Sequence, residues 1–252
     1  MLHYSQVIYM DERIGYHHCA VSRPMAKSRQ AKGKRDPYDG LRPWSAITHG
    51  LGAVLGVLGT VFLLQRAVAV GRDGAALFAL LIYGLSMIGL YTASTLYHCL
   101  RTGVRGRVAL RKYDHISIYF LIAGSYTPIC SLMLPQDGGL PMLAAVWAVA
   151  IAGTVLTVIW IGAPRWLTSA IYIFMGWMAL FTLPSLLQHM PVEGMFWLVL
   201  GGVLYTVGGV LYAVKWPGRN NPRFGCHEIF HVFILLGSAA HFFLMYQVVV
   251  FP

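Results

Sequence analysis

Seven long hydrophobic runs, separated by short polar interruptions, dominate the sequence. An α-helix rises about 1.5 Å per residue, so about 20 apolar residues cross roughly 30 Å of hydrocarbon. Each run is about that long, whereas the strands of a transmembrane barrel are shorter and alternate in polarity. The sequence therefore predicts an all-α, polytopic membrane protein with a seven-helix transmembrane bundle. The runs are 44–70, 74–100, 113–134, 139–161, 166–187, 194–214 and 227–251.

The composition agrees with a membrane protein. Of the 252 residues, 57% are hydrophobic and only 11% are charged, and the mean hydropathy is +0.62. So few charges cannot cover the surface of a soluble protein of this size. The loops are short, so residues 44–252 are predicted to form one transmembrane domain. Residues 1–43 mix basic, small and aromatic residues without a period, and we expect a basic cytoplasmic tail without regular structure.

The positions of the basic residues predict the orientation in the membrane. Seventeen of the 19 Lys and Arg residues fall before the first run or in the connections on the same side, and only Arg66 and Arg72 fall on the other side. Cytoplasmic loops carry the excess of Lys and Arg, so the N-terminus is predicted to be cytoplasmic and the C-terminus outside. The net charge of +10 is thus a topology signal of a multi-pass protein of the plasma or inner membrane, and no nucleic-acid partner is expected.

A few polar residues within the runs are predicted to lie at the same depth. His49 is near the start of the first run, His98 near the end of the second, Asp114 at the start of the third, and His227 and His231 at the start of the seventh. In the predicted topology all of these positions are close to the cytoplasmic face. Ionisable residues in membrane helices are costly and usually functional, so a shared site is indicated.

Two of these histidines have the spacing of metal ligands. His227 and His231 are four residues apart, so both imidazoles project from one helix face. A third histidine would complete a facial set and leave a fourth tetrahedral position open, as in catalytic zinc sites. We choose His98 as the third ligand because Asp114 follows it across one short connection. Ser94 precedes His98 by one turn and can orient a ligand or the water on the metal.

Each residue also has an ordinary structural interpretation. His98 alone is typical of a hydrogen bond between helices, and Asp114 of an ion pair with a neighbouring arginine. Ser94 can bond to its own helix. His49 can be a ligand, an outer residue of the site or a packing residue, and for His241, which lies deeper, we expect a hydrogen bond to another helix. Close helix contacts are predicted at small residues, namely Gly52, Gly56, Gly201, Gly202, Gly208 and Gly209.

The motifs resemble the hemolysin III branch of the progestin and adipoQ receptor (PAQR) family, which is related to the alkaline ceramidases. The resemblance covers nearly the whole chain from Trp44 and combines Ser94-x-x-x-His98, Asp114-His115 leading to 123–128 (AGSYTP), and His227-x-x-x-His231. It implies zinc bound by His98, His227 and His231, with Asp114 holding the water on the metal and Ser94 nearby.

Members of that family have been described as hormone receptors, ceramide hydrolases, regulators of membrane fluidity or energetics, and haemolysins. Our leading hypothesis is a zinc-dependent hydrolase of a lipid amide or ester, such as a ceramide-like lipid. A receptor or membrane-homeostasis regulator with structural zinc and a pore-forming haemolysin are alternatives. The HExxH pattern 227–231 also permits an intramembrane protease in which Glu228 is the general base.

Overall fold

Helices account for all regular secondary structure in the part of the chain that the computed structural model describes, residues 41–134, 138–218, 221 and 224–251. Seven helical segments within these residues are long and apolar enough to cross a membrane. The prediction of an all-α, seven-helix membrane fold is therefore confirmed. The predicted tail lies almost entirely in residues 1–40, which are outside the described residues.

Four of the seven spans are single α-helices, and three include a helical turn of another type. The single helices are α1 (Pro43–Ala69), α2 (Gly74–Cys99), α4 (Gly139–Ile159) and α7 (Val192–Val214). The third span consists of α3 (Val104–Pro128) and the π-helical η1 (Ile129–Met133), and the last of α8 (Cys226–Leu244) and the π-helical η3 (Met245–Val249). The fifth span consists of α5 (Arg165–Trp177), the 3₁₀-helical η2 (Met178–Thr182) and α6 (Leu183–His189).

The irregular turns in the third and fifth spans are next to prolines. Pro128 is the last residue of α3, and Pro184 lies in the first turn of α6. Proline has no backbone N–H and its ring clashes with the preceding turn, so the regular hydrogen-bond ladder cannot continue through it. The α-helix accordingly gives way to a π-helical or 3₁₀-helical turn at these two places.

The third span begins earlier than its hydrophobic run. The run starts at residue 113, but α3 starts at Val104, so four basic residues of the predicted loop are helical. The side chain of Arg107 is only 7% exposed and donates hydrogen bonds to the carbonyls of Tyr97 (2.8 Å) and Leu100 (2.9 Å) at the end of α2. This contact stabilises a polar first turn that a hydropathy pattern does not show.

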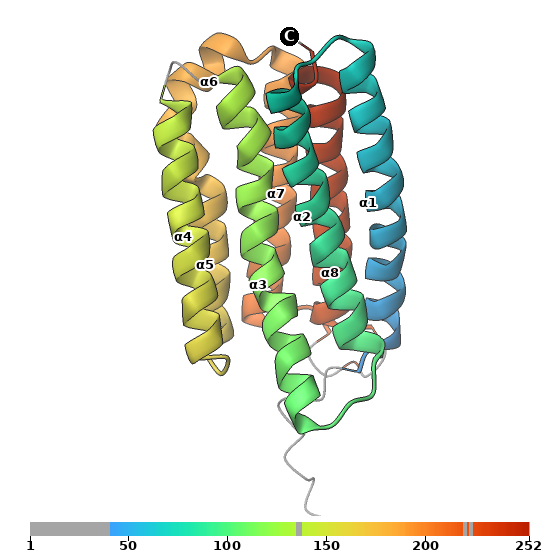
Figure 1. The fold of residues 1–252 in the computed structure, drawn as a ribbon. Helices are drawn as coiled ribbons and strands as arrows, with labels where there is room; N and C mark the ends of the chain where they lie inside the picture. Colours follow the sequence, from blue (N-terminus) through green and yellow to red (C-terminus); the bar gives the residue numbers. More distant parts are fainter. Residues whose placement is uncertain (1–40, 135–137, 219–220, 222–223, 252) are drawn as a thin grey trace, which may run out of the picture. The chain divides into compact units, whose positions relative to one another are not determined.

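The helices form a bundle in which the first and last spans are neighbours (Figure 1). Helix α1 packs against α2 and α8, α3 against α2 and α4, and α7 against α5 and α8. Glycines permit several of these contacts: a Cβ atom on Gly84 of α2 would lie 2.4 Å from Thr60 of α1, and one on Gly208 of α7 would lie 2.7 Å from Phe233 of α8. A Cβ atom on Gly52 or Gly201 would likewise lie within 3 Å of a neighbouring helix, but one on Gly202 would meet no atom within 4 Å, so the prediction for Gly202 is wrong.

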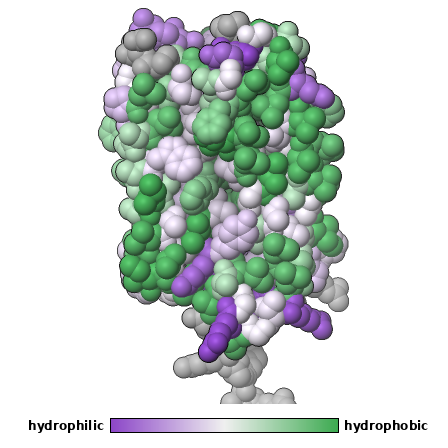
Figure 2. Space-filling model, viewed as in Figure 1, coloured by the Kyte–Doolittle hydropathy of each residue, from purple (hydrophilic) through white to green (hydrophobic). Residues whose placement is uncertain are grey.

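The surface of the bundle is hydrophobic between two polar rims (Figure 2). Large apolar side chains are exposed on most of the helices, for example Phe62 at 57%, Phe181 at 74% and Phe196 at 57%. In water this surface would be costly, whereas lipid tails cover it without penalty. The chain is therefore a multi-pass membrane protein, and the orientation of its ends across the membrane stays a prediction.

Candidate metal centre

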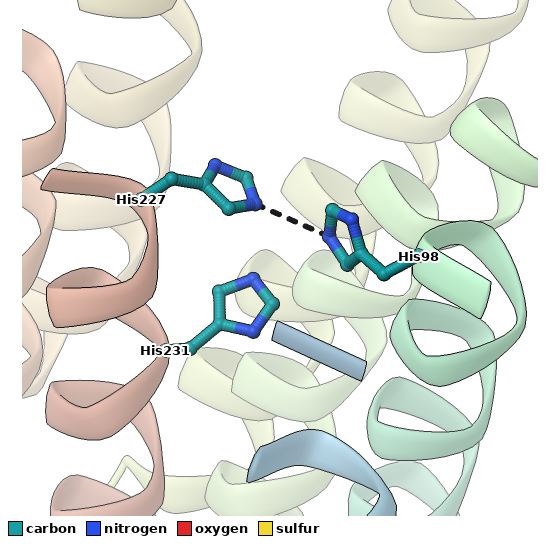
Figure 3. Close-up of side chains that lie close together, drawn as sticks. All are labelled: His98, His227 and His231. Atoms are coloured by element: carbon teal, nitrogen blue, oxygen red, sulfur yellow. Dashed lines mark hydrogen bonds between the residues drawn. The ribbon is translucent and has the colours of Figure 1, made fainter. Parts of the chain in front are cut away.

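The start of α8 and the end of α2 determine where three histidines lie at one end of the bundle. Helix α8 begins at Cys226 because the Glu228 carboxylate accepts a hydrogen bond from the backbone N–H of Gly225 at 2.8 Å, which caps the first turn. This start puts His227 and His231 in the first two turns of α8. His98 lies in the last turn of α2, which ends at Cys99. The side chains from the two helices face one another (Figure 3).

The three imidazoles form a compact group. The Nε2 atoms of His98 and His227 are 3.1 Å apart, and one nitrogen from each of the three rings lies within 4.8 Å of the others. The ring centroids are 4.7–5.0 Å apart. His98 and His231 are each 2% exposed. The structure thus brings together the three residues that the sequence predicts as ligands.

The nitrogens in this group fit a metal ion. Zinc binds histidine nitrogen at about 2.0–2.1 Å, so two nitrogens of one tetrahedral site lie about 3.3 Å apart. The distance between His98 and His227 is close to this value. His231 Nδ1 makes no hydrogen bond of acceptable geometry, although the Ser45 carbonyl is nearby. Three imidazoles that converge in this way, two of them buried and His227 half-buried, are suited to a cation with an affinity for nitrogen ligands.

Asp114 and Ser94 lie beside the histidines. Asp114 is 9% exposed and Ser94 is 1% exposed. The Asp114 carboxylate is 3.6 Å from His115 Nδ1, and the His98 ring and the Ser94 hydroxyl are close enough to interact with it electrostatically. The ion-pair partner of Asp114 is thus the adjacent His115, where the alternative interpretation expects a neighbouring arginine. A carboxylate in this position can accept a proton from a group held next to the histidines.

A cavity of about 200 Å³ connects the site with the interior of the bundle. Asp114, Ser94 and His231 line it at one end, and mostly apolar side chains line the rest as far as Leu134 at the end of the third span. Asp114 and Leu134 are separated by about 20 residues, or roughly 30 Å along the helix. The cavity therefore has a polar end at the histidines and a long apolar part.

Comparison with known proteins identifies the family. Residues 43–242 match the sequence profile described as haemolysin-III related. The chain belongs to this family. It is 36% identical over 199 residues to the Hemolysin-3 homolog of Bacillus subtilis (strain 168), which covers 79% of this chain and 90% of that protein. Hemolysin-3 of Bacillus cereus is 34% identical over 199 residues, with 79% and 87% covered.

A more distant relative is the Monocyte to macrophage differentiation factor of Homo sapiens, 25% identical over 173 residues, which cover 66% of this chain and 68% of that protein. Together with the family match, it confirms the resemblance to the hemolysin III branch of the PAQR family that the motifs indicate.

Glu228 of this haemolysin-III-related chain is bonded to residues other than the three histidines. Its carboxylate accepts hydrogen bonds from Arg42 (2.9 Å), the Ser45 hydroxyl (3.3 Å) and the Gly225 backbone N–H (2.8 Å), and the side chain is 2% exposed. These three donors occupy both oxygens. Glu228 therefore stabilises the start of α8 and joins it to α1, and this arrangement does not leave it available as a general base.

Two further histidines of the sequence lie outside the three-histidine group. His49 is stacked on His231, with ring centroids 3.7 Å apart. His241 packs against Gly201 and Tyr205 of α7, and neither of its ring nitrogens has a hydrogen-bond partner among the described residues. The backbone of Leu198 of α7 is the neighbour nearest to the hydrogen bond expected from His241 to another helix, although its geometry is poor.

The structure also shows residues that the sequence did not single out. The His98 ring packs against Tyr97, with centroids 4.8 Å apart, and the His227 ring against Tyr212, with centroids 5.5 Å apart. The guanidinium group of Arg107 lies over the Tyr97 ring, 4.8 Å from the ring centroid. That of Arg165 lies over the Tyr212 ring, 4.9 Å from the centroid. Tyr97 could have been found as the neighbour of His98, but no sequence signal distinguishes Arg107 from the other basic residues of its loop or pairs Arg165 with Tyr212.

Proposed function

We propose that this haemolysin-III-related protein is a zinc-dependent hydrolase of a lipid amide or ester, such as a ceramide-like lipid. The observation that supports it is the convergence of His98, His227 and His231 with Asp114 at the polar end of one apolar cavity. A set of three neutral ligands with an acid beside an open position is typical of catalytic zinc sites, whereas structural sites are closed by four ligands.

The residues have separate roles in this scheme. Zinc, when bound, would polarise a carbonyl group and lower the pKa of its water to about 7. Asp114 accepts the proton from the attacking water and returns it to the leaving group. Ser94 holds the Asp114 carboxylate in position from α2. The apolar walls of the cavity bind the hydrocarbon of the lipid and keep bulk water away from the reacting atoms.

The lipid enters from the side of the bundle. Trp177 and Leu180 of the fifth span and Val199 of α7 line the cavity and are also exposed on the outer surface of the bundle. The cavity wall therefore reaches the lipid-facing surface between these spans. A substrate with long hydrocarbon chains can pass from the bilayer to the site without crossing water.

Metal analysis followed by an activity assay tests the proposal. The purified protein is expected to contain about one zinc per chain and to hydrolyse at least one lipid in a panel of ceramides and phospholipids. His231→Ala should remove zinc and hydrolysis together, and His241→Ala, a buried histidine on the same helix, should keep the zinc. Protein without stoichiometric metal would refute the proposal.

A receptor or membrane-homeostasis regulator with structural zinc is the second candidate. It is supported by the position of the histidines, because α2 and α8 have few direct contacts elsewhere and an ion would cross-link them. Removal of the metal distinguishes the two functions. Loss of thermal stability with no hydrolysis of any lipid by the zinc-loaded protein favours the structural role.

The protease and the haemolysin are weaker alternatives. A protease of the HExxH type needs Glu228 as its base, and this residue is bonded to Arg42, Ser45 and Gly225. The name Hemolysin-3 belongs to the Bacillus relatives. Purified protein added to red cells tests a lytic activity of this chain directly, and lysis would favour a pore-forming function.

A further inference from the structure

His49 has an unusual environment on the side of the metal centre that faces α1. Its side chain is buried, with 3% of its surface exposed. The ring lies parallel to that of His231, with centroids 3.7 Å apart and an interplanar angle of 17°. Tyr91 of α2 meets the His49 ring edge-on, at 5.0 Å and 81°. Neither ring nitrogen of His49 makes a hydrogen bond of acceptable geometry among the described residues, although the His231 backbone is nearby, and the two ring contacts are its best-defined interactions.

The packing of α1 against α8 determines this stack. Contacts between the two helices recur along their length, beginning with the hydrogen bond from Ser45 to Glu228 and continuing with His49 on His231. Further along, Gly52 and Gly59 allow the same approach. A Cβ atom on Gly52 would lie 2.8 Å from Leu235, and one on Gly59 would lie 3.0 Å from Phe242. The position of His49 is therefore set by the register of the two helices.

His49 does not have the geometry of a fourth ligand. The lone pair of an imidazole nitrogen lies in the plane of the ring and points away from it. Two rings stacked in parallel direct their lone pairs along parallel planes, so they cannot both point to one ion between them. His49 offers its flat face to His231, and His231 offers its edge to His98 and His227.

The stack supplies an orientation that His231 otherwise lacks. A histidine that binds a metal usually donates its other ring N–H to a carboxylate, carbonyl or water, and this bond fixes the ring angle. His231 Nδ1 lies near the Ser45 carbonyl, but the hydrogen bond between them has poor geometry and holds the ring angle only loosely. We propose that His49 is a positioning residue of the metal centre, which holds the His231 ring in its ligating orientation by stacking. This inference rests on the proposed metal site.

Two substitutions with side chains of similar size distinguish the effect of a flat ring from the effects of the ring nitrogens and of the volume that they fill. His49→Phe keeps a flat ring without nitrogens, and His49→Leu fills the same space without a flat ring. His241→Phe is the matched control, because it replaces a buried histidine of the bundle far from the three ligands. Zinc affinity is measured by competition with a chromophoric chelator on monodisperse protein in detergent, and the visible spectrum of the cobalt-substituted protein reports the ligand geometry.

We expect His49→Leu to weaken zinc binding by about tenfold or more, within the range of about 10- to 100-fold seen when outer residues of a metal site are lost. The cobalt spectrum should change as well. His49→Phe should keep the zinc affinity within about threefold, and His241→Phe should not change it.

Equal affinities of the wild-type protein and His49→Leu would overturn the inference while leaving the metal site in place. A loss of affinity in His49→Phe as large as in His49→Leu would also overturn it, because the nitrogens and not the ring face would then matter. If one variant does not fold, the affinity of the other against the wild type decides. Wild-type protein that binds no zinc refutes the proposed function itself.

Discussion

Two buried carboxylates near the histidines differ in what surrounds them. Glu228 accepts three hydrogen bonds, one of them from the guanidinium group of Arg42. Asp114 lines the cavity, and its ion-pair partner is His115 at 3.6 Å. A fully bonded carboxylate stabilises a fold, whereas one that faces a cavity can exchange a proton with a substrate. The surroundings therefore favour a structural role for Glu228 and support the chemical role that we propose for Asp114.

This difference predicts opposite effects of two equivalent substitutions. Asp114→Asn should lower lipid hydrolysis by about 10²- to 10⁴-fold, because the proton acceptor is lost, and should leave the zinc content unchanged. Glu228→Gln should lower the free energy of unfolding by about 1–3 kcal/mol, because the charged carboxylate that accepts three hydrogen bonds becomes a neutral amide. This variant should keep most of the turnover per zinc-loaded molecule. Turnover, zinc content and thermal unfolding of the two variants check this. An inactive Glu228→Gln protein that is stable and zinc-loaded would support the protease instead.

At the level of residues, the sequence predicts the three histidines well and their surroundings less well. Helical spacing brings His227 and His231 together. Because successive spans run in opposite directions, the end of the second span, with His98, lies at the same end of the bundle as the start of the seventh. The stack of His49 on His231 depends on the angle between two helices, which no local pattern encodes. The same holds for Arg165 on Tyr212 and for the bonds of Glu228 to Arg42 and Ser45, since these partners are more than 40 residues apart in sequence.

At the level of elements, contact between α1 and α2 depends on a glycine that can be tested. A Cβ atom on Gly84 would lie 2.4 Å from the Thr60 side chain, and the Thr60 hydroxyl is fixed by a 2.7 Å hydrogen bond to the Gly56 carbonyl. Gly84→Ala should therefore destabilise the protein by about 1–3 kcal/mol, because the two helices must move apart. Thermal unfolding in detergent measures the change.

Gly89 of the same helix is the matched control, because a Cβ atom there would meet nothing within 4 Å. Alanine is a better helix former than glycine by about 1 kcal/mol, so Gly89→Ala should be neutral or slightly stabilising. Unfolding temperatures that are equal for the two variants would show that close packing at Gly84 does not limit the contact between α1 and α2.

The number and order of the spans could be predicted from hydropathy, but their irregular parts could not. Length and apolar composition are sufficient to define a membrane helix, because the bilayer thickness sets the requirement. The polar first turns of α3 are stabilised by Arg107 binding to the end of α2, and Arg72 similarly donates hydrogen bonds to the carbonyls of Val249, Val250 and Phe251 beside η3. Such bonds between elements appear only when the helices are placed in space.

At the level of the whole molecule, the seven spans place the start of α1 and the end of the last span at opposite ends of the bundle (Figure 1). The histidines lie at the end where α1 begins, so the orientation in the membrane decides which compartment they are near. Of the ten Lys and Arg residues that the structure describes, all but Arg66 and Arg72 belong to the helix ends or connections at that end. The positive-inside rule predicts that this end is cytoplasmic.

Reporter fusions test the orientation. An alkaline phosphatase fused after the last residue should be active, because this enzyme folds only outside the cytoplasm, and a fluorescent protein at the same position should stay dark. The same two reporters inserted at residues 101–103, between α2 and α3, should give the opposite result. Replacing basic residues of the connection between α2 and α3 with glutamine while adding lysines beside Arg72 should reduce this asymmetry, because charge near short loops sets the orientation. An active phosphatase at residues 101–103 of the unaltered chain would place the histidine group at the outer face, where zinc and water would reach it from outside the cell.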